Sequence, residues 1–135
     1  MKAIRVYEFG DPSVLKYEDV PMLEAGAGQV LVRIHAVGVN PVDTYIRAGT
    51  HAIRPQLPYT PGSDAAGVVE SLGEGVTGWA VGDRVYTARA LTGAYAEFAL
   101  CAAEDLHPLP AGCTFAQGTV CRSRWTMRHR HCRHS

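Results

Sequence analysis

The 135-residue sequence lacks the cysteine pattern that staples small secreted domains. Its four cysteines are unevenly spaced and form no CxxC pair: Cys101, Cys113, Cys121 and Cys132. No signal-peptide pattern stands at the start, so we expect reduced thiols in a cytoplasmic protein. No apolar run is long enough to cross a bilayer, so we expect no membrane partner. Internal repeats are also absent.

Acidic residues are missing from the last 17 positions. All 13 Asp and Glu lie before Gly118 with 8 of the 13 Lys and Arg, so residues 1–118 carry a net charge of −5. Residues 119–135 hold the other five basic residues, all Arg, and carry +5. Because the two compositions differ so sharply, we predict one folded domain at 1–118 and a basic Arg/His-rich tail at 119–135.

The tail, TVCRSRWTMRHRHCRHS, has no Gly, no Pro and no amphipathic period. Three explanations stay open. The first is an artefactual end produced by a reading-frame change or truncation. The second is a loose basic tail whose arginines contact RNA phosphates. The third is a metal site, although no standard spacing fits its candidate ligands His129, His131, Cys132 and His134. We expect the tail to be disordered or poorly packed, because it has little apolar surface to offset the ordering entropy.

Short β-type segments separated by turn residues dominate residues 1–110. Alternating apolar, β-branched and aromatic residues predict strands at 2–8, 14–20, 29–37, 66–72 and 94–100. Residues 81–86 are predicted to form a tight turn that leads into a further strand, and residues 106–110 close the domain. In the 29–37 strand we expect Arg33 and His35 to face partly to solvent, with a structural role for His35. Strands and turns at this frequency indicate a mainly β, barrel-type fold with long loops.

One short helix interrupts this pattern. Asn40 can cap a helix, Pro41 suits the first helical position, and Asp43 complements the dipole in the first turn. Gly49 suits the position after the last turn, so the predicted helix is 41–48. An irregular loop is predicted at 50–61.

The stretch 57–69, LPYTPGSDAAGVV, organises the rest. Pro58 and Pro61 fix φ and exclude a regular helix. Gly62 and Gly67 bracket Asp64 before an apolar strand, which suggests a loop whose backbone approaches another group closely. A well-made turn into a buried strand explains the same residues.

The frame GSDAAGV at 62–68 resembles the G-H-E-x-x-G-x-V segment of the medium-chain dehydrogenase/reductase superfamily. Its form is similar to the zinc-free branch, the NADPH quinone oxidoreductases related to zeta-crystallin. Three further stretches agree in order and spacing: KAIRVYEFGDPSVL, GVNPVDTYIRAG and VGDRVYT. The resemblance covers residues 1–118 and implies the GroES-like β-barrel of the catalytic domain.

The resemblance also implies that zinc is absent. In the zinc-dependent members a Cys and a His bind the metal at the positions of Asn40 and Ser63, and amide and hydroxyl oxygens replace thiolate and imidazole poorly. Without a metal, hydrogen-bond donors must polarise a carbonyl. Asn40 and Tyr45 are the candidate catalytic residues, although capping explains Asn40 and core packing explains Tyr45 equally well.

Further roles follow from the resemblance. Tyr45 is expected to contact the nicotinamide of NADPH, and His51, Thr60 and Ser63 to bind substrate. His51 stands where the family usually has a second Tyr, although imidazole can also donate a hydrogen bond. Asp64 is expected to hold the loop.

The implied reaction is hydride or electron transfer from NADPH to a quinone or an α,β-unsaturated carbonyl. In the family, which forms oligomers, a following Rossmann domain binds the cofactor through a glycine-rich turn, and no GxGxxG turn exists in this chain. Two functions therefore stay open. In the first, the chain is the substrate-side part of a truncated quinone oxidoreductase. In the second, it is a catalytically inactive fragment that acts as a binding module and binds nucleic acid only through the basic tail.

Overall fold

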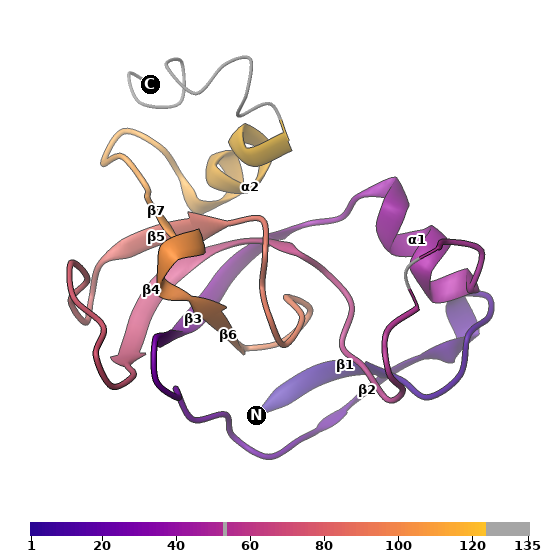
Figure 1. Cartoon of the computed structure of the whole chain (residues 1–135). Helices are drawn as coiled ribbons and strands as arrows, with labels where there is room; N and C mark the ends of the chain where they lie inside the picture. The colour runs from indigo at the N-terminus through magenta and orange to yellow at the C-terminus, as the bar shows by residue number, and fades with distance from the viewer. Residues whose placement is uncertain (53, 124–135) are drawn as a thin grey trace.

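The computed structural model describes residues 1–52 and 54–123 (Figure 1). Strands β1 (Lys2–Val6) and β2 (Leu15–Asp19) form a two-stranded antiparallel sheet, with a 3-10 turn at Pro12–Val14 between them. A second, antiparallel sheet has the strand order β6-β3-β4-β5-β7. Its strands are β3 (Gln29–Gly38), β4 (Asp64–Leu72), β5 (Arg84–Thr87), β6 (Phe98–Ala102) and β7 (His107–Pro108), with a second 3-10 turn at Ala103–Asp105.

Isolated bridges join the two sheets and their loops. Val6 exchanges two backbone hydrogen bonds with Tyr59, at 2.8 and 3.0 Å, and Ala3 forms a bridge with Ala96. The prediction of a mainly β fold is therefore confirmed. The prediction was a barrel. In the structure, single bridges connect two open sheets, and the strands do not form one continuous ladder.

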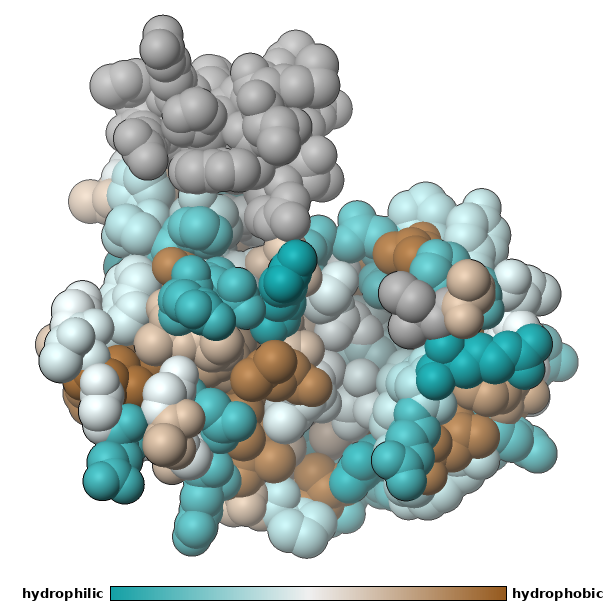
Figure 2. Space-filling model, viewed as in Figure 1, coloured by the Kyte–Doolittle hydropathy of each residue, from teal (hydrophilic) through white to brown (hydrophobic). Residues whose placement is uncertain are grey.

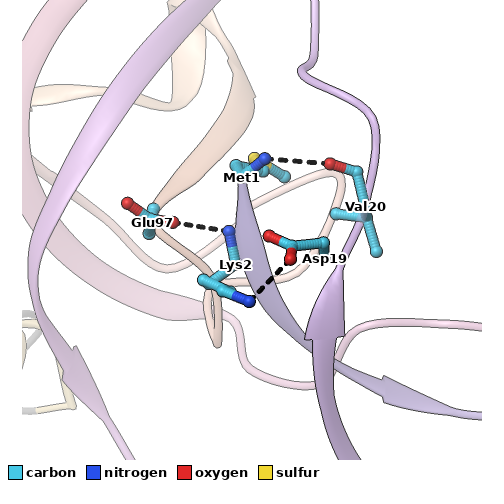
Figure 3. Close-up of polar contacts among 5 residues, drawn as sticks. All are labelled: Met1, Lys2, Asp19, Val20 and Glu97. Carbon is cyan, nitrogen blue, oxygen red and sulfur yellow. Dashed lines mark hydrogen bonds and ion pairs between the residues drawn. The ribbon is translucent and has the colours of Figure 1, made fainter.

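Polar contacts hold the start of β1 in place (Figure 3). The amino group of Met1 donates to the carbonyl of Val20 at 2.9 Å, and Lys2 Nζ lies 2.6 Å from Asp19 Oδ2. The backbone N–H of Lys2 donates to the carboxylate of Glu97. Because the Lys2–Asp19 pair is exposed, it orders the strand end more than it stabilises the fold.

The main hydrophobic core is formed mostly by side chains from the strands of the larger sheet. Its buried cluster consists of Val30, Val32, Val69, Val85, Cys101 and Leu106. Along β3 the alternation places Val30 and Val32 inward and exposes Arg33 and His35, as predicted. The ring of His35 stacks on Phe115 at 4.3 Å, which is a structural contact.

Helix α1 (Pro41–Ala48) has the predicted bounds and ends at Gly49, whose φ of 79° is left-handed. The strand predicted at 94–100 begins later in the structure, where β6 starts at Phe98 and ends at Ala102. Residues 94–97 bond elsewhere, since Ala94 N–H donates to Gly62 and Tyr95 N–H donates to Pro61, both at 3.0 Å. Strand alternation alone did not distinguish a ladder from single bridges.

A second helix, α2 (Phe115–Ser123), corrects the prediction of one helix. The Thr114 N–H donates to Gln117 Oε1 at 2.8 Å, and the Gln117 N–H donates to Thr114 Oγ1 at 3.1 Å. This reciprocal capping starts the helix. It packs against β3, β4 and β5, above the sheet in Figure 1.

Helix α2 crosses the predicted domain boundary at 118. The helix runs on to Ser123, and Thr119 is buried, with its hydroxyl donating to the Ala116 carbonyl at 2.8 Å. Residues 124–135, including the candidate metal ligands of the tail, lie outside the described residues. The three explanations for that tail stay predictions.

Apolar side chains on the face shown in Figure 2 lie in small separate groups among hydrophilic ones. The large hydrophobic side chains that are exposed in the described part of the chain are Tyr7, Tyr17, Met22, Val39, Tyr45, Val81 and Leu91. Within residues 1–52 and 54–123 no helix is long and apolar enough to span a membrane.

Candidate functional site

A cavity of about 450 Å³ lies between the start of β1, the segment after β2, helix α1 and two loops, 55–63 and 90–93. Its polar lining residues are Arg5, Asp43, Tyr59, Thr60, Ser63 and Thr92. Four prolines contribute rigid apolar wall: Pro21, Pro55, Pro58 and Pro61. A concave, largely apolar space with a few polar groups is typical of a small-molecule site.

Close backbone packing positions the 58–63 loop, as the sequence predicted at Gly62. Gly62 has a φ of +96°, and a Cβ there would lie 2.5 Å from Cδ1 of Tyr95. Only glycine lets this loop press against the segment before β6 without strain. The two loops that line the cavity are also in direct contact, because the Ala90 N–H donates to the Ser63 carbonyl at 3.2 Å.

The buried carboxylate of Asp64 fixes Asn40. The Asn40 side-chain amide donates to Asp64 Oδ2 at 2.8 Å, and Asp64 is only 6% exposed at the start of β4. Asp64 thus ties the start of α1 to the loop before β4, the holding role that we predicted. The amide nitrogen carries two N–H groups, so Asn40 can serve a second acceptor.

Asp43 is a site residue whose importance the sequence did not indicate beyond the helix start. It is 7% exposed, lines the cavity, and accepts from the Asn40 N–H at 2.9 Å and from the Tyr95 hydroxyl at 3.1 Å. Burial, and then the carboxylate of Asp43, raise the pKa of Tyr95 far above its ordinary value. Tyr95 therefore stays protonated and donates to Asp43.

Tyr59 is a second missed residue, although it lies inside the stretch that we singled out. Its hydroxyl is buried and has no hydrogen-bond partner among the described residues. Burial raises the pKa of Tyr59, with Arg47 opposing this and Asp43 adding to it. Tyr59 lines the cavity, and its hydroxyl is the buried side-chain polar group that the described residues leave without a partner.

The predicted site residues do not all meet in this cavity. Thr60 and Ser63 line it, and Asn40 is bonded to the neighbour of Ser63. Tyr45 is 54% exposed on α1 and His51 is half-buried after it, both outside the cavity lining. The roles assigned to these five residues stay predictions.

Metal ligands are not grouped in the described part of the chain. Within residues 1–52 and 54–123, no three His, Cys, Asp or Glu side chains are placed to hold a metal ion. At the two positions where the resembled zinc enzymes have ligands, Asn40 donates its amide to a carboxylate and Ser63 lines the cavity.

Residues 26–111 match the family model of the alcohol dehydrogenase GroES-like domain. The chain belongs to this family, the catalytic domain of the medium-chain dehydrogenases and reductases. Because the match covers all five strands of the larger sheet, the class of the domain follows from this sheet as a whole and not from one motif.

Within that class, similar proteins include several quinone oxidoreductases. The quinone oxidoreductase of Rattus norvegicus is 53% identical over 121 residues, which cover 89% of this chain and 37% of the rat protein. A mycobacterial quinone oxidoreductase structure has a TM-score of 0.82 at 41% identity, covering 88% of this chain and 36% of that one. The Escherichia coli quinone oxidoreductase complexed with NADPH has a TM-score of 0.84 at 34% identity, with the same coverage.

The chain therefore spans 37% of the length of the rat relative. The resemblance to the quinone oxidoreductase branch is confirmed for this portion. The activity, substrates and partners of the full-length relatives are treated below as proposals.

Proposed function

We propose that this chain is the substrate-side domain of an NADPH-dependent quinone oxidoreductase that needs no zinc and acts on quinones or other α,β-unsaturated carbonyls. The observation that carries the proposal is the 53% identity to rat quinone oxidoreductase over 121 residues. The chain covers 37% of that protein, so we expect it to be inactive by itself. A cytoplasmic location remains part of this proposal.

The described residues suit one end of NADPH. Tyr45 presents an exposed phenol on α1, which can contact a nicotinamide ring. The pyrophosphate needs a glycine-rich turn before a helix, and the sequence contains no GxGxxG. When bound, the cofactor would supply the hydride, and this chain would supply only one wall of its site.

Carbonyl polarisation is assigned to hydrogen-bond donors. The amide of Asn40 is held by Asp64 at 2.8 Å and keeps a second N–H, and the phenol of Tyr45 is exposed four residues after the start of α1. Preorganised donors of this kind stabilise charge that develops on an oxygen. The absence of zinc is proposed from the same residues, because amide and hydroxyl groups are weak zinc ligands.

A chimera tests this function. Residues 1–118 of this chain replace the matching segment of rat quinone oxidoreductase, and quinone-dependent oxidation of NADPH is followed. We expect turnover by the chimera and none by the 135-residue chain alone. In the chimera Tyr45→Phe should lower kcat about tenfold or more, whereas Tyr17→Phe, on exposed β2, should leave it unchanged.

The possible results separate the proposal from its details. A folded chimera that binds NADPH but does not reduce quinones contradicts the proposed function. Full activity of an Asn40→Ala, Tyr45→Phe double variant contradicts only the assigned donors. The RNA-binding alternative depends on residues outside the described part of the chain, and we do not propose it.

A further inference from the structure

Two buried carboxylates hold Asn40, one at its backbone and one at its side chain. Asp43 Oδ2 accepts from the backbone N–H of Asn40 at 2.9 Å, and Asp64 Oδ2 accepts from the side-chain amide at 2.8 Å. The two acids are only 7% and 6% exposed. Hydrogen bonds to charged groups are strong, and more so away from water. Both the backbone and the amide of Asn40 are therefore fixed.

Helix capping explains only part of this arrangement. The bond from the Asn40 N–H to Asp43 is one half of a capping box, which is usual at the start of a helix. A cap supplies acceptors to the open N–H groups of the first turn, so it does not require the Asn40 amide to donate to Asp64. Nor does it require the Tyr95 hydroxyl, which donates to Asp43 at 3.1 Å. These last two bonds need another explanation.

Tyr95 is itself held on both sides of its backbone. Its N–H donates to the Pro61 carbonyl at 3.0 Å, and its carbonyl accepts from the Ile4 N–H at 2.8 Å. Its ring packs on Gly62, where an added Cβ would lie 2.5 Å from Cδ1 of the ring. Burial, and then Asp43, raise the pKa of Tyr95 far above its ordinary value, so the phenol keeps its proton. The hydroxyl is thus a donor whose position is set by β1 and the 58–63 loop.

A connected set of hydrogen bonds therefore joins the start of α1 to the 58–63 loop by two routes. One route runs from the loop through Tyr95 and Asp43, and the other runs through Asp64, which follows the loop at the start of β4. Both routes end at Asn40, and the same loop lines the cavity. Such bracing matters for a donor that must meet a reacting oxygen, because a displacement of about 1 Å can cost about a hundredfold in rate.

We propose that Tyr95 is a positioning residue which, acting through Asp43 and together with Asp64, holds the Asn40 amide where it donates to the substrate carbonyl. Tyr95 does not touch the substrate in this arrangement. The hydrogen bonds belong to the 135-residue chain alone, whereas their use in catalysis rests on the function proposed above. The test therefore has one part in the isolated chain and one in the chimera with rat quinone oxidoreductase.

The isolated chain offers a probe of one side chain, because Asn40 is the only asparagine in the sequence. Selective labelling with 15N-asparagine gives a single pair of side-chain amide signals in a nuclear magnetic resonance spectrum. In the wild-type chain we expect one of the two protons to exchange slowly with water, because it is bonded to Asp64. Tyr95→Phe should shift both signals and accelerate this exchange about fivefold, whereas Tyr17→Phe, on exposed β2, should change neither.

The chimera shows whether this positioning serves the reaction. Tyr95→Phe should lower kcat about tenfold and leave the KM for NADPH unchanged. Asn40→Ala removes the amide but keeps the backbone N–H that bonds to Asp43. In the Asn40→Ala chimera Tyr95→Phe should therefore have no further effect on kcat, since both changes act on the same donor. Val85→Ala, in the core, is the control for lost stability and should leave kcat unchanged in the folded enzyme.

The proposal is overturned if the Asn40 signals do not respond to Tyr95→Phe, or if the Asn40→Ala chimera is fully active. It is also overturned if Tyr95→Phe lowers kcat by the same factor with and without the Asn40 amide. None of these results affects the proposed function while the unsubstituted chimera reduces quinones.

A chimera that binds NADPH without reducing quinones contradicts the proposed function instead. Asn40 signals that depend on Tyr95 would then still support the positioning of the amide. Thermal unfolding checks that each variant folds. If Tyr95→Phe does not fold, Asp64→Asn replaces it in the chimera, since it keeps an acceptor oxygen for the Asn40 amide but loses the charge. The same loss of effect in the Asn40→Ala background then decides the outcome.

Discussion

At the scale of single residues, the shape of the cavity depends on a close backbone contact at Gly93, where there is no room for a Cβ atom. Gly93 is buried with a φ of +90°, and a Cβ there would lie 2.0 Å from the carbonyl oxygen of Thr60. Because the obstacle is backbone, it cannot rotate away as a side chain can. Gly93 thus holds the 90–93 loop against the 58–63 loop.

Gly93→Ala should therefore destabilise the fold by about 3 kcal/mol or more, from left-handed strain and the backbone clash together. Gly78→Ala is the matched control, because Gly78 has a φ of +86° and nothing within 4 Å of the added Cβ. There we expect only the conformational penalty, about 1 kcal/mol. Urea unfolding of both variants measures the difference, and equal losses would show that the two loops do not touch at Gly93.

Residues with a local role could be predicted from the sequence, and residues with a long-range role could not. Gly62 was singled out because it follows Pro61 and, with Gly67, brackets Asp64, a local pattern that suggested a close backbone approach. The burial of Asp43 arises from Tyr95, 52 positions later, and from the fold around α1. No pattern near Asp43 records that partner, so it was assigned only to the helix dipole.

At the scale of elements, the same distinction separates the two helices. Helix α1 was predicted with its observed bounds because Asn40, Pro41 and Gly49 mark both ends locally. A comparable signal for α2 existed in Thr114 and Gln117, which cap it reciprocally. It was missed because the change of composition after Gly118 suggested an end of structure there.

One aromatic ring of helix α2 contacts side chains from two strands of the sheet. Phe115 stacks on His35 at 4.3 Å on one side, and the guanidinium of Arg84 lies 4.7 Å from its centroid. Arg84 also donates to the carbonyls of Pro110 and Cys113, just before the helix. Arg84 thus connects β5, the preceding turn and α2.

Phe115→Ala should loosen α2 selectively. The lost ring contacts are worth about 2 kcal/mol for a half-buried aromatic, and they bear on one helix rather than on the sheet. Amide hydrogen exchange should accelerate in residues 115–119 more than in β3 and β4. Phe98→Ala, which removes a ring from β6 next to Arg33, should spare α2. Equal acceleration throughout the sheet and α2 in the Phe115 variant would mean that α2 is not a separately opening element.

At the scale of the whole molecule, the fold encloses several weak acids in their neutral form. Burial raises the pKa of the Cys101 thiol to about 12, with Asp105 adding to the effect. Burial likewise raises the pKa of Tyr95 and of Tyr59. These residues belong to the core and to the cavity wall, so both regions hold protons that the unfolded chain releases at a lower pH.

Alkaline pH should therefore weaken the fold before it ionises these groups. Between about pH 9 and pH 12 the unfolded chain releases protons that the folded chain still holds, so the unfolded state binds fewer protons and the free energy of unfolding falls as pH rises. Below about pH 9 this stability is fully present. Urea unfolding at intervals from pH 8 to about pH 11 should show a falling midpoint, with a shallower slope in Cys101→Ala and in Tyr95→Phe. Tyr17→Phe, on the exposed face of β2, is the control that should keep the wild-type slope, and slopes identical in all four proteins would show that the buried acids do not control alkaline stability.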